Sequence, residues 1–103
     1  MTLTHERRRF LRHVVSLDVL WDGSSAFAPS RLSDISLGGC YVDSRSTPNL
    51  GETVELTVTL DGVSTVLRGT VTQVHLGMGF GVAFSADPGV AQHVRAFLSS
   101  LPT

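Results

Sequence analysis

The stretch "TVELTVTLDGVSTVLRGTVTQVH", residues 53–75, decides the fold class. Apolar and polar residues alternate over 54–60, which is the period of a strand with one buried face. Asp61-Gly62 is a pair favoured in tight hairpin turns, and the chain returns over 66–74 through a run rich in β-branched residues. These features predict two antiparallel strands joined by a short turn.

Further strands are predicted on both sides of this hairpin. The alternation of apolar and polar residues is regular in the first and the last of them, and weaker in the second, where Pro29 removes a backbone donor. Gly38-Gly39 separates the second from the third, and "LGMG" at 76–79 forms a turn before the last. The predicted segments are 14–21, 27–36, 40–44 and 80–84.

The last part of the chain predicts a helix instead of a strand. Asp87 and Pro88 suit the N-cap and the first helical position. Apolar residues then recur at helical spacing, which predicts a helix over about 88–99 with one apolar stripe. We expect this stripe to pack over the mouth or the side of the sheet. Its members are Val90, Val94, Phe97 and Leu101.

Five or six short antiparallel strands followed by one helix predict an all-β dominated fold, a small closed or nearly closed barrel. With 103 residues, of which 42% are hydrophobic and 17% charged, we expect one folded domain. No apolar run approaches the ~20 residues that a membrane-spanning helix needs, and no secretory signal is recognisable. We therefore expect a cytoplasmic protein without membrane insertion.

The sequence offers little for catalysis or for metal binding. Cys40 is the only cysteine, which excludes an intrachain disulfide, and the four histidines lack the spacing of metal ligands. No histidine stands in a recognisable context with a nucleophile and an orienting acid. "GMGFG" at 77–81 leads into a predicted strand, so it lacks the helix that a phosphate-binding loop requires. We predict a protein that is not an enzyme and that has no metal and no cofactor.

The segment "ERRRFLRH", residues 6–13, stands apart by its charge. Residues 1–13 carry a net charge of +3, the remainder of the chain carries −4, and there is no lysine. The planar guanidinium suits bidentate contacts to phosphate or guanine better than an ammonium does. Taken alone, such a cluster is most often a solvated terminus, and a preference for arginine codons explains the missing lysines equally well. The arginines of this cluster are Arg7, Arg8, Arg9 and Arg12.

Two short spacings are more specific than the charge itself. Arg8 and Arg12 are four residues apart, which places them on one side of either a helix or an extended arm. Asp34 and Ser36 are two apart, so on a strand they share a face. A carboxylate can accept hydrogen bonds from guanine, and a serine hydroxyl can donate or accept beside it. Gly39 permits a positive φ or the close approach of a ligand.

Taken together, these residues resemble the signature of the PilZ domain, a bacterial receptor module for cyclic di-GMP. The resemblance rests on Arg8-x-x-x-Arg12 followed by Asp34-x-Ser36-x-x-Gly39, with no departure at these positions. The segment "LRGTVTQVHLGMGFGVAF" also looks like that family's strand–turn–strand, and the likeness extends from Glu6 to the terminal helix. It implies a six-stranded antiparallel β-barrel with a C-terminal α-helix.

The resemblance also implies roles for individual residues. The two spaced arginines would hold phosphates and the O6/N7 edge of guanine, and the Asp/Ser pair would read guanine. The glycine would keep the backbone clear, and one or two stacked ligand molecules would bind. The implied cyclic di-GMP site consists of Arg8, Arg12, Asp34, Ser36 and Gly39, with Arg7, Arg9 and Gly38 as additional candidates.

We divide the chain into a flexible N-terminal arm, 1–13, and a barrel with its helix, 14–103. Ordering about six residues costs roughly 6–12 kcal/mol, and each hydrogen bond to a charged group returns ~1.5–3 kcal/mol. Several contacts must therefore act together. We predict that the arm becomes ordered around the ligand, as a clamp, when the ligand binds. We expect Phe10 and Leu11 to pack against the barrel and seat the arm.

The predicted function is a receptor whose ordered arm alters the interaction with a downstream protein partner, as a monomer or a homodimer. An alternative is an interaction module of the same fold that does not bind the nucleotide. A nucleic-acid-binding barrel with a basic arm is a third alternative. The acidic body offers no continuous track for phosphates, so we expect no nucleic acid partner.

Overall fold

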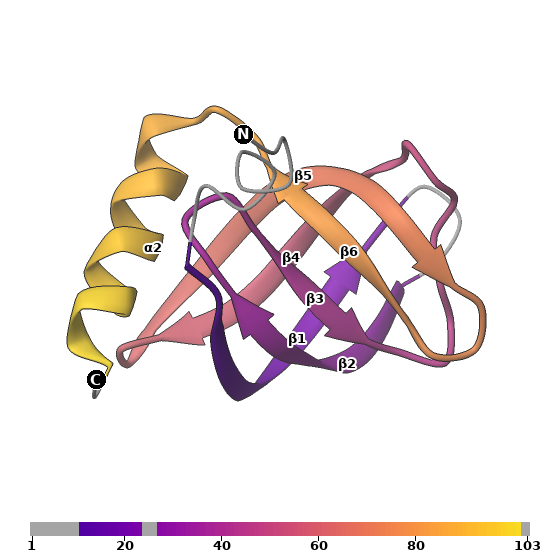
Figure 1. Ribbon diagram of the computed structural model, residues 1–103, viewed down its shortest axis with the longest axis horizontal. Helices are drawn as coiled ribbons and strands as arrows, with labels where there is room; N and C mark the ends of the chain where they lie inside the picture. Colours follow the sequence, from indigo (N-terminus) through magenta and orange to yellow (C-terminus); the bar gives the residue numbers. More distant parts are fainter. Residues whose placement is uncertain (1–10, 24–26, 102–103) are drawn as a thin grey trace, which may run out of the picture.

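The computed structural model describes residues 11–23 and 27–101. Within this part of the chain six strands close into an antiparallel barrel in the order β1-β2-β3-β6-β5-β4, and one helix follows (Figure 1). The architecture predicted from the sequence is confirmed. The elements are β1 (His13–Asp22), β2 (Phe27–Ile35), β3 (Gly39–Asp43), β4 (Thr53–Leu60), β5 (Val63–His75), β6 (Gly79–Phe84) and α2 (Pro88–Ser100).

The β4–β5 hairpin forms as predicted, with its turn at Asp61-Gly62. Both turn residues have positive φ, 56° and 81°, which is the backbone that a two-residue hairpin turn needs. The second strand begins at Val63, three residues before the predicted start at 66. The alternating apolar residues of β4, from Val54 to Leu60, are at most 3% exposed and form one wall of the core.

The strand β2 forms through Pro29, which is paired with Leu20 of β1. The pairing of β2 with β3 begins only at Arg31, opposite Asp43. Pro29 therefore lies where β2 has a strand neighbour on one side only, a position at which a residue without N–H is tolerated. This placement explains why a proline weakens the sequence pattern of β2 without ending the strand.

The core fills the interior of the barrel. Trp21 and Phe80 meet edge to face with their ring centroids 5.1 Å apart, and both are fully buried. The Trp21 Nε1–H donates to Ser44 Oγ at 3.2 Å, so the polar edge of the indole is satisfied. Fully burying a side chain such as Leu32 or Leu56 contributes about 1.5–3 kcal/mol.

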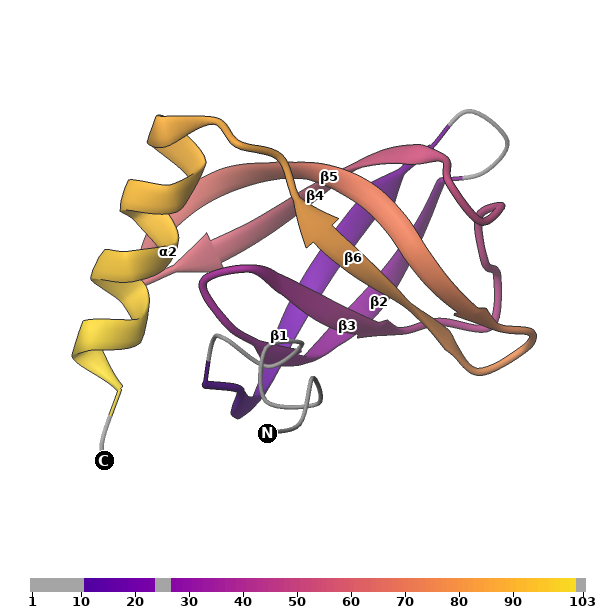
Figure 2. The ribbon, with the colours of Figure 1, turned by 45° about the horizontal axis from the view of Figure 1, so that its top comes forward.

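The helix α2 covers one end of the barrel, beside β4 and β5 (Figures 1 and 2). Asp87 is its N-cap, and the Asp87 carboxylate accepts from the N–H of Gly89 at 2.8 Å. Its buried residues, Val90, Val94 and Phe97, belong to the core, so the predicted docking of the apolar stripe is confirmed. Among residues 11–23 and 27–101, no helix is long and apolar enough to cross a membrane.

Candidate functional site

The structure brings Arg12 and Asp34 together on the outside of the barrel. Arg12 Nη1 lies 3.1 Å from both carboxylate oxygens of Asp34, although the two residues are 22 apart in the chain. Asp34 is paired across the β1–β2 ladder with Val14, and Arg12 immediately precedes β1. The antiparallel ladder therefore positions this arginine at the end of β2.

The Arg12–Asp34 pair is accessible to a ligand. The arginine side chain is 54% exposed and the aspartate side chain 25% exposed. Arg12 uses only Nη1 in this contact, and its Nη2 and Nε donate to no residue that the structure describes. Ion pairs with this exposure contribute about 0–1 kcal/mol, so a ligand can exchange the contact at little cost.

Ser36 forms the turn between β2 and β3. Its hydroxyl accepts from the N–H groups of Gly38 and Gly39 at 3.2 Å each, and its own N–H donates to the Gly39 carbonyl at 2.8 Å. The residue is 8% exposed. Because β2 ends at Ile35, the argument that Asp34 and Ser36 share one strand face is wrong. A direct contact of Ser36 with ligand stays a prediction.

Gly39 is required by packing between strands. It is not among the glycines with positive φ, which are Gly51, Gly62 and Gly77, so that explanation of the residue is wrong. A Cβ at position 39 would instead collide with the carbonyl oxygen of Val82 on β6. The close approach at this glycine comes from the protein's own backbone, and contact with a ligand remains a prediction.

Two residues beside the pair were not identified from the sequence. Tyr41 is the ladder partner of Asp34, and its hydroxyl is hydrogen-bonded to His75 Nδ1 at 2.7 Å. Partial burial raises the pKa of Tyr41, and the carboxylates of Asp43 and Asp34 add to the rise, so the phenol is neutral at neutral pH. The alternation of β3, with Cys40 and Val42 inward, was the signal that places Tyr41 on the outer face.

The comparisons with known proteins agree with this arrangement. A family model described as "PilZ domain" matches residues 6–100. The chain belongs to the PilZ family. PilZ domains are non-catalytic binding domains, and the family comprises receptors of c-di-GMP. A search of curated proteins gives no match.

Solved structures share the fold of this chain. The PilZ domain of CeSA from a cellulose-synthesizing bacterium superposes with a TM-score of 0.70 at 18% identity, covering 86% of this chain and 96% of that one. The Bacillus subtilis inhibitor of motility MotI/DgrA superposes with a TM-score of 0.68 at 19% identity, and the match covers 92% of this chain and 53% of that one. The Borreliella burgdorferi PlzA protein in complex with c-di-GMP superposes with a TM-score of 0.64 at 15% identity, and the match covers 92% of this chain and 42% of that one. This chain thus spans about half or less of the last two proteins.

Beneath the ion pair of this PilZ domain lies Cys40, which is 4% exposed. Burial raises the pKa of the Cys40 thiol far above its usual range. The charge of Asp34 adds to the rise, and the charge of Arg12 opposes it. The thiol is therefore protonated and serves as a small apolar core residue, with no role in chemistry at the surface.

The remaining predicted residues divide into two groups. Arg7, Arg8, Arg9 and Phe10 lie outside the described residues, so the predictions on them remain predictions. Leu11 is 77% exposed, and the expectation that it packs against the barrel is wrong for this residue. Of the two motifs, the structure brings together Arg12 with Asp34, and it places Ser36, Gly38 and Gly39 in the adjoining turn.

Proposed function

We propose that this PilZ domain binds cyclic di-GMP on the outer face of the barrel around Arg12 and Asp34. Binding orders the N-terminal arm, and the ordered arm alters the interaction with a downstream protein partner. The observation that carries the proposal is the Arg12–Asp34 contact. It joins the arginine motif to the aspartate motif across 22 residues of sequence, at an accessible position.

The chemistry of the pair suits a guanine nucleotide. The Asp34 carboxylate can accept from the N1–H and the exocyclic amine of guanine, in exchange for its contact with Arg12. The released guanidinium can then donate to a phosphate or to the O6/N7 edge of a base, a geometry in which arginine is strong. The exchange replaces one exposed ion pair with two charge-assisted contacts to ligand.

The turn beside the pair supports the site indirectly in this proposal. The Ser36 hydroxyl is occupied by the N–H groups of Gly38 and Gly39, so Ser36 fixes the end of β2 on which Asp34 stands. The arm contributes Arg8, with Arg7 and Arg9 as further contacts to phosphate. Because ordering the arm costs roughly 6–12 kcal/mol for about six residues, several such contacts must form together.

Titration calorimetry tests the proposal, with cyclic di-GMP compared against GTP and cyclic GMP. We expect binding of cyclic di-GMP and much weaker binding of the other two. Arg8→Ala and Arg12→Ala should each reduce the affinity about ten- to a hundredfold, since each removes charge-assisted hydrogen bonds. Arg68→Ala, whose arginine pairs with Glu55 on β4, is the matched control and should bind like the parent chain.

Two results would overturn the assignment. Unchanged affinity in both arginine variants would show that the site lies elsewhere. No heat of binding with cyclic di-GMP would favour a PilZ domain that acts as an interaction module without the nucleotide. Differential scanning calorimetry of each variant separates a loss of the site from a loss of the fold.

A further inference from the structure

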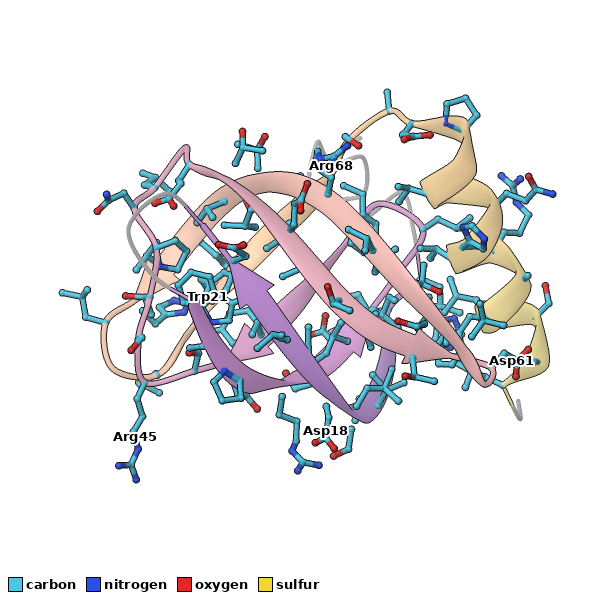
Figure 3. The ribbon with its side chains drawn as sticks, turned by 180° about the vertical axis from the view of Figure 1, so that it is seen from behind. Asp18, Trp21, Arg45, Asp61 and Arg68 are labelled. Carbon is cyan, nitrogen blue, oxygen red and sulfur yellow. The ribbon has the colours of Figure 1, made fainter. Side chains whose placement is uncertain are left out.

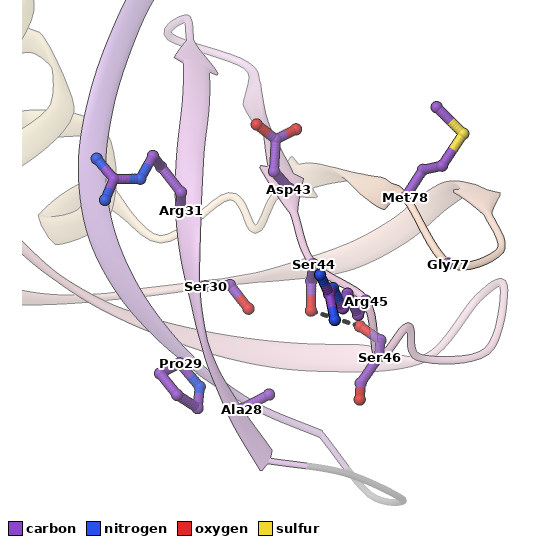
Figure 4. Close-up of a pocket in the computed structure, with 10 residues that line it drawn as sticks. All are labelled: Ala28, Pro29, Ser30, Arg31, Asp43, Ser44, Arg45, Ser46, Gly77 and Met78. Carbon is purple, nitrogen blue, oxygen red and sulfur yellow. Dashed lines mark hydrogen bonds between the residues drawn. The ribbon is translucent and has the colours of Figure 1, made fainter.

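A groove opens where β2 and β3 separate. The β2–β3 pairing ends at Arg31 and Asp43, whereas β2 stays paired with β1 as far as Phe27. Beyond β3 the chain instead follows the β5–β6 turn, where the Ser44 N–H donates to the Met78 carbonyl at 3.0 Å. The groove has a volume of about 600 Å³ and is lined by residues 28–31, 43–46 and 77–78 (Figure 4).

This groove does not offer a good edge for an added strand. Pro29 stands in the middle of the β2 segment that lines it, and Pro29 is paired with Leu20 on the other side. A proline in a paired strand has no N–H for the ladder, so its nitrogen belongs on the side without a strand neighbour. An incoming strand would find no donor at this point, and recognition must come from side chains.

One polar group on the walls of the groove has unused hydrogen-bonding capacity. Ser30 Oγ is buried and has no hydrogen-bond partner among the residues that the structure describes. Ser44 Oγ accepts from Trp21 and donates to the Ser46 carbonyl at 2.6 Å. Buried hydroxyls without a partner are uncommon in folded proteins, which marks Ser30 as a group that a bound molecule or a water completes.

Arg45 is the lining residue whose positive charge is free to bind a ligand. It is exposed and forms no ion pair with any residue in the described part of the chain. The other arginine, Arg31, is already engaged by Asp18 at 3.2 Å and by Ser16 at 2.8 Å. Figure 3 shows Arg45 reaching outward at the end of the barrel opposite α2.

Apolar side chains stand beside this cation. Met78, which lines the groove, is 71% exposed, and Leu76 in the same turn is 84% exposed. Arginine and methionine are both enriched at protein–protein interfaces, where a flexible thioether adapts to its partner. Large apolar residues at the tip of an exposed turn gain little stability from the fold and are accessible to a partner.

We propose that this groove binds a segment of a partner protein that carries a carboxylate next to an apolar side chain. The carboxylate pairs with Arg45, and the apolar side chain packs on Met78 and Leu76. Arg31 is paired with Asp18, and Asp43 accepts from Ser33, so Arg45 is the charge that the lining leaves for an acidic segment. The groove contains none of the nucleotide-site residues, so this inference goes beyond the proposed function and is tested without nucleotide.

The experiment selects peptides from a random displayed library on the purified full chain, then titrates the consensus peptide by fluorescence anisotropy. We expect a consensus with Asp or Glu near a large apolar residue. Arg45→Glu should weaken binding about tenfold or more, because it reverses the charge that recognises the carboxylate, and Met78→Ser about threefold. Arg95→Glu, at another exposed arginine, which lies on α2, is the matched control and should bind unchanged.

Several results would overturn the proposal. They are a selection without enrichment, a consensus without acidic residues, and equal affinity for the parent chain and Arg45→Glu. Light scattering that shows a dimer broken by Arg45→Glu would assign the groove to a second copy of this chain. Amide chemical shifts upon peptide addition should change at residues 28, 30, 31, 43–46, 77 and 78, and changes confined to other residues would place the peptide elsewhere.

Discussion

Arg68–Glu55 and Arg12–Asp34 are two of the three arginine–carboxylate pairs that the described residues form on the outside of the barrel, and they are built differently. Arg68 and Glu55 are direct ladder partners on β5 and β4, and both Nε and Nη2 of the arginine donate to one oxygen of Glu55. Arg12 precedes β1 and reaches Asp34 with one nitrogen only. The Arg68–Glu55 contact joins two residues that the β4–β5 ladder holds opposite each other. The Arg12–Asp34 contact lies just before β1 and leaves Nη2 and Nε of the arginine without a described partner.

This difference separates a structural contact from a candidate recognition site. The hydrogen bond from Arg68 to Glu55 raises the pKa of the arginine, and its charge is satisfied within the sheet. Arg12 keeps Nη2 and Nε available, and the surrounding surface adds Tyr41 and His75. The two arginine side chains are similarly exposed, at 54% and 52%, so local geometry distinguishes the pairs.

The largest effect that separates the pairs is expected from Asp34→Ala. It removes the carboxylate that would accept from guanine, and cyclic di-GMP affinity should fall about ten- to a hundredfold, the value of charge-assisted hydrogen bonds. Glu55→Ala is the matched control and should leave affinity unchanged, because its ladder lies outside the proposed site. Titration calorimetry measures both, and equal losses in the two variants would remove the distinction.

A smaller effect is expected from Ser36→Ala, which tests the turn that supports Asp34 of the Arg12–Asp34 pair. The variant leaves the N–H groups of Gly38 and Gly39 without their acceptor, and the free energy of unfolding should fall by about 1–2 kcal/mol. Urea denaturation measures the loss. Ser64→Ala, an exposed serine on β5, is the control and should change stability little.

A loss of stability no larger than that of Ser64→Ala would show that the turn does not depend on the Ser36 hydroxyl. In that case the hydroxyl is free for ligand, and the affinity of Ser36→Ala for cyclic di-GMP should fall while its stability does not. The two measurements together decide between support of the turn and direct contact.

The two hairpin turns show how much of the structure could be predicted from the sequence. The turn at Asp61-Gly62 depends on local backbone preference, so the residue pair alone predicted it. The turn at 36–39 depends on a serine side chain and on the approach of Val82 from β6, which is a contact distant in sequence. Strands, helix and core followed from periodicity, because the barrel buries one face of each element.

The candidate site could be predicted only in part, for the same reason. The motif spacing indicated Arg12 and Asp34, but strand parity could not predict that β2 ends at Ile35 and that the Ser36 hydroxyl closes the following turn. Tyr41 and His75 meet through the register of β3, β6 and β5, which the sequence does not state. The pattern of one strand predicts which of its residues face the core. Which residues of adjacent strands become neighbours depends on the register between the strands.

The smallest expected effect is on the free energy of unfolding without ligand, where the Arg68–Glu55 and Arg12–Asp34 pairs should differ slightly. Glu55→Ala should lower the free energy of unfolding by up to about 1 kcal/mol, and Asp34→Ala by less, because exposed pairs contribute little and only the first is fixed by direct ladder partners. Urea denaturation at low and high salt measures both, and salt should shrink the effect of Glu55→Ala through screening. A larger loss in Asp34→Ala would mean that the Arg12–Asp34 contact is structural. Breaking the Arg12–Asp34 contact when ligand binds would then cost more than the roughly 0–1 kcal/mol typical of an exposed ion pair. The N-terminal arm would need to form further contacts to ligand to offset that cost.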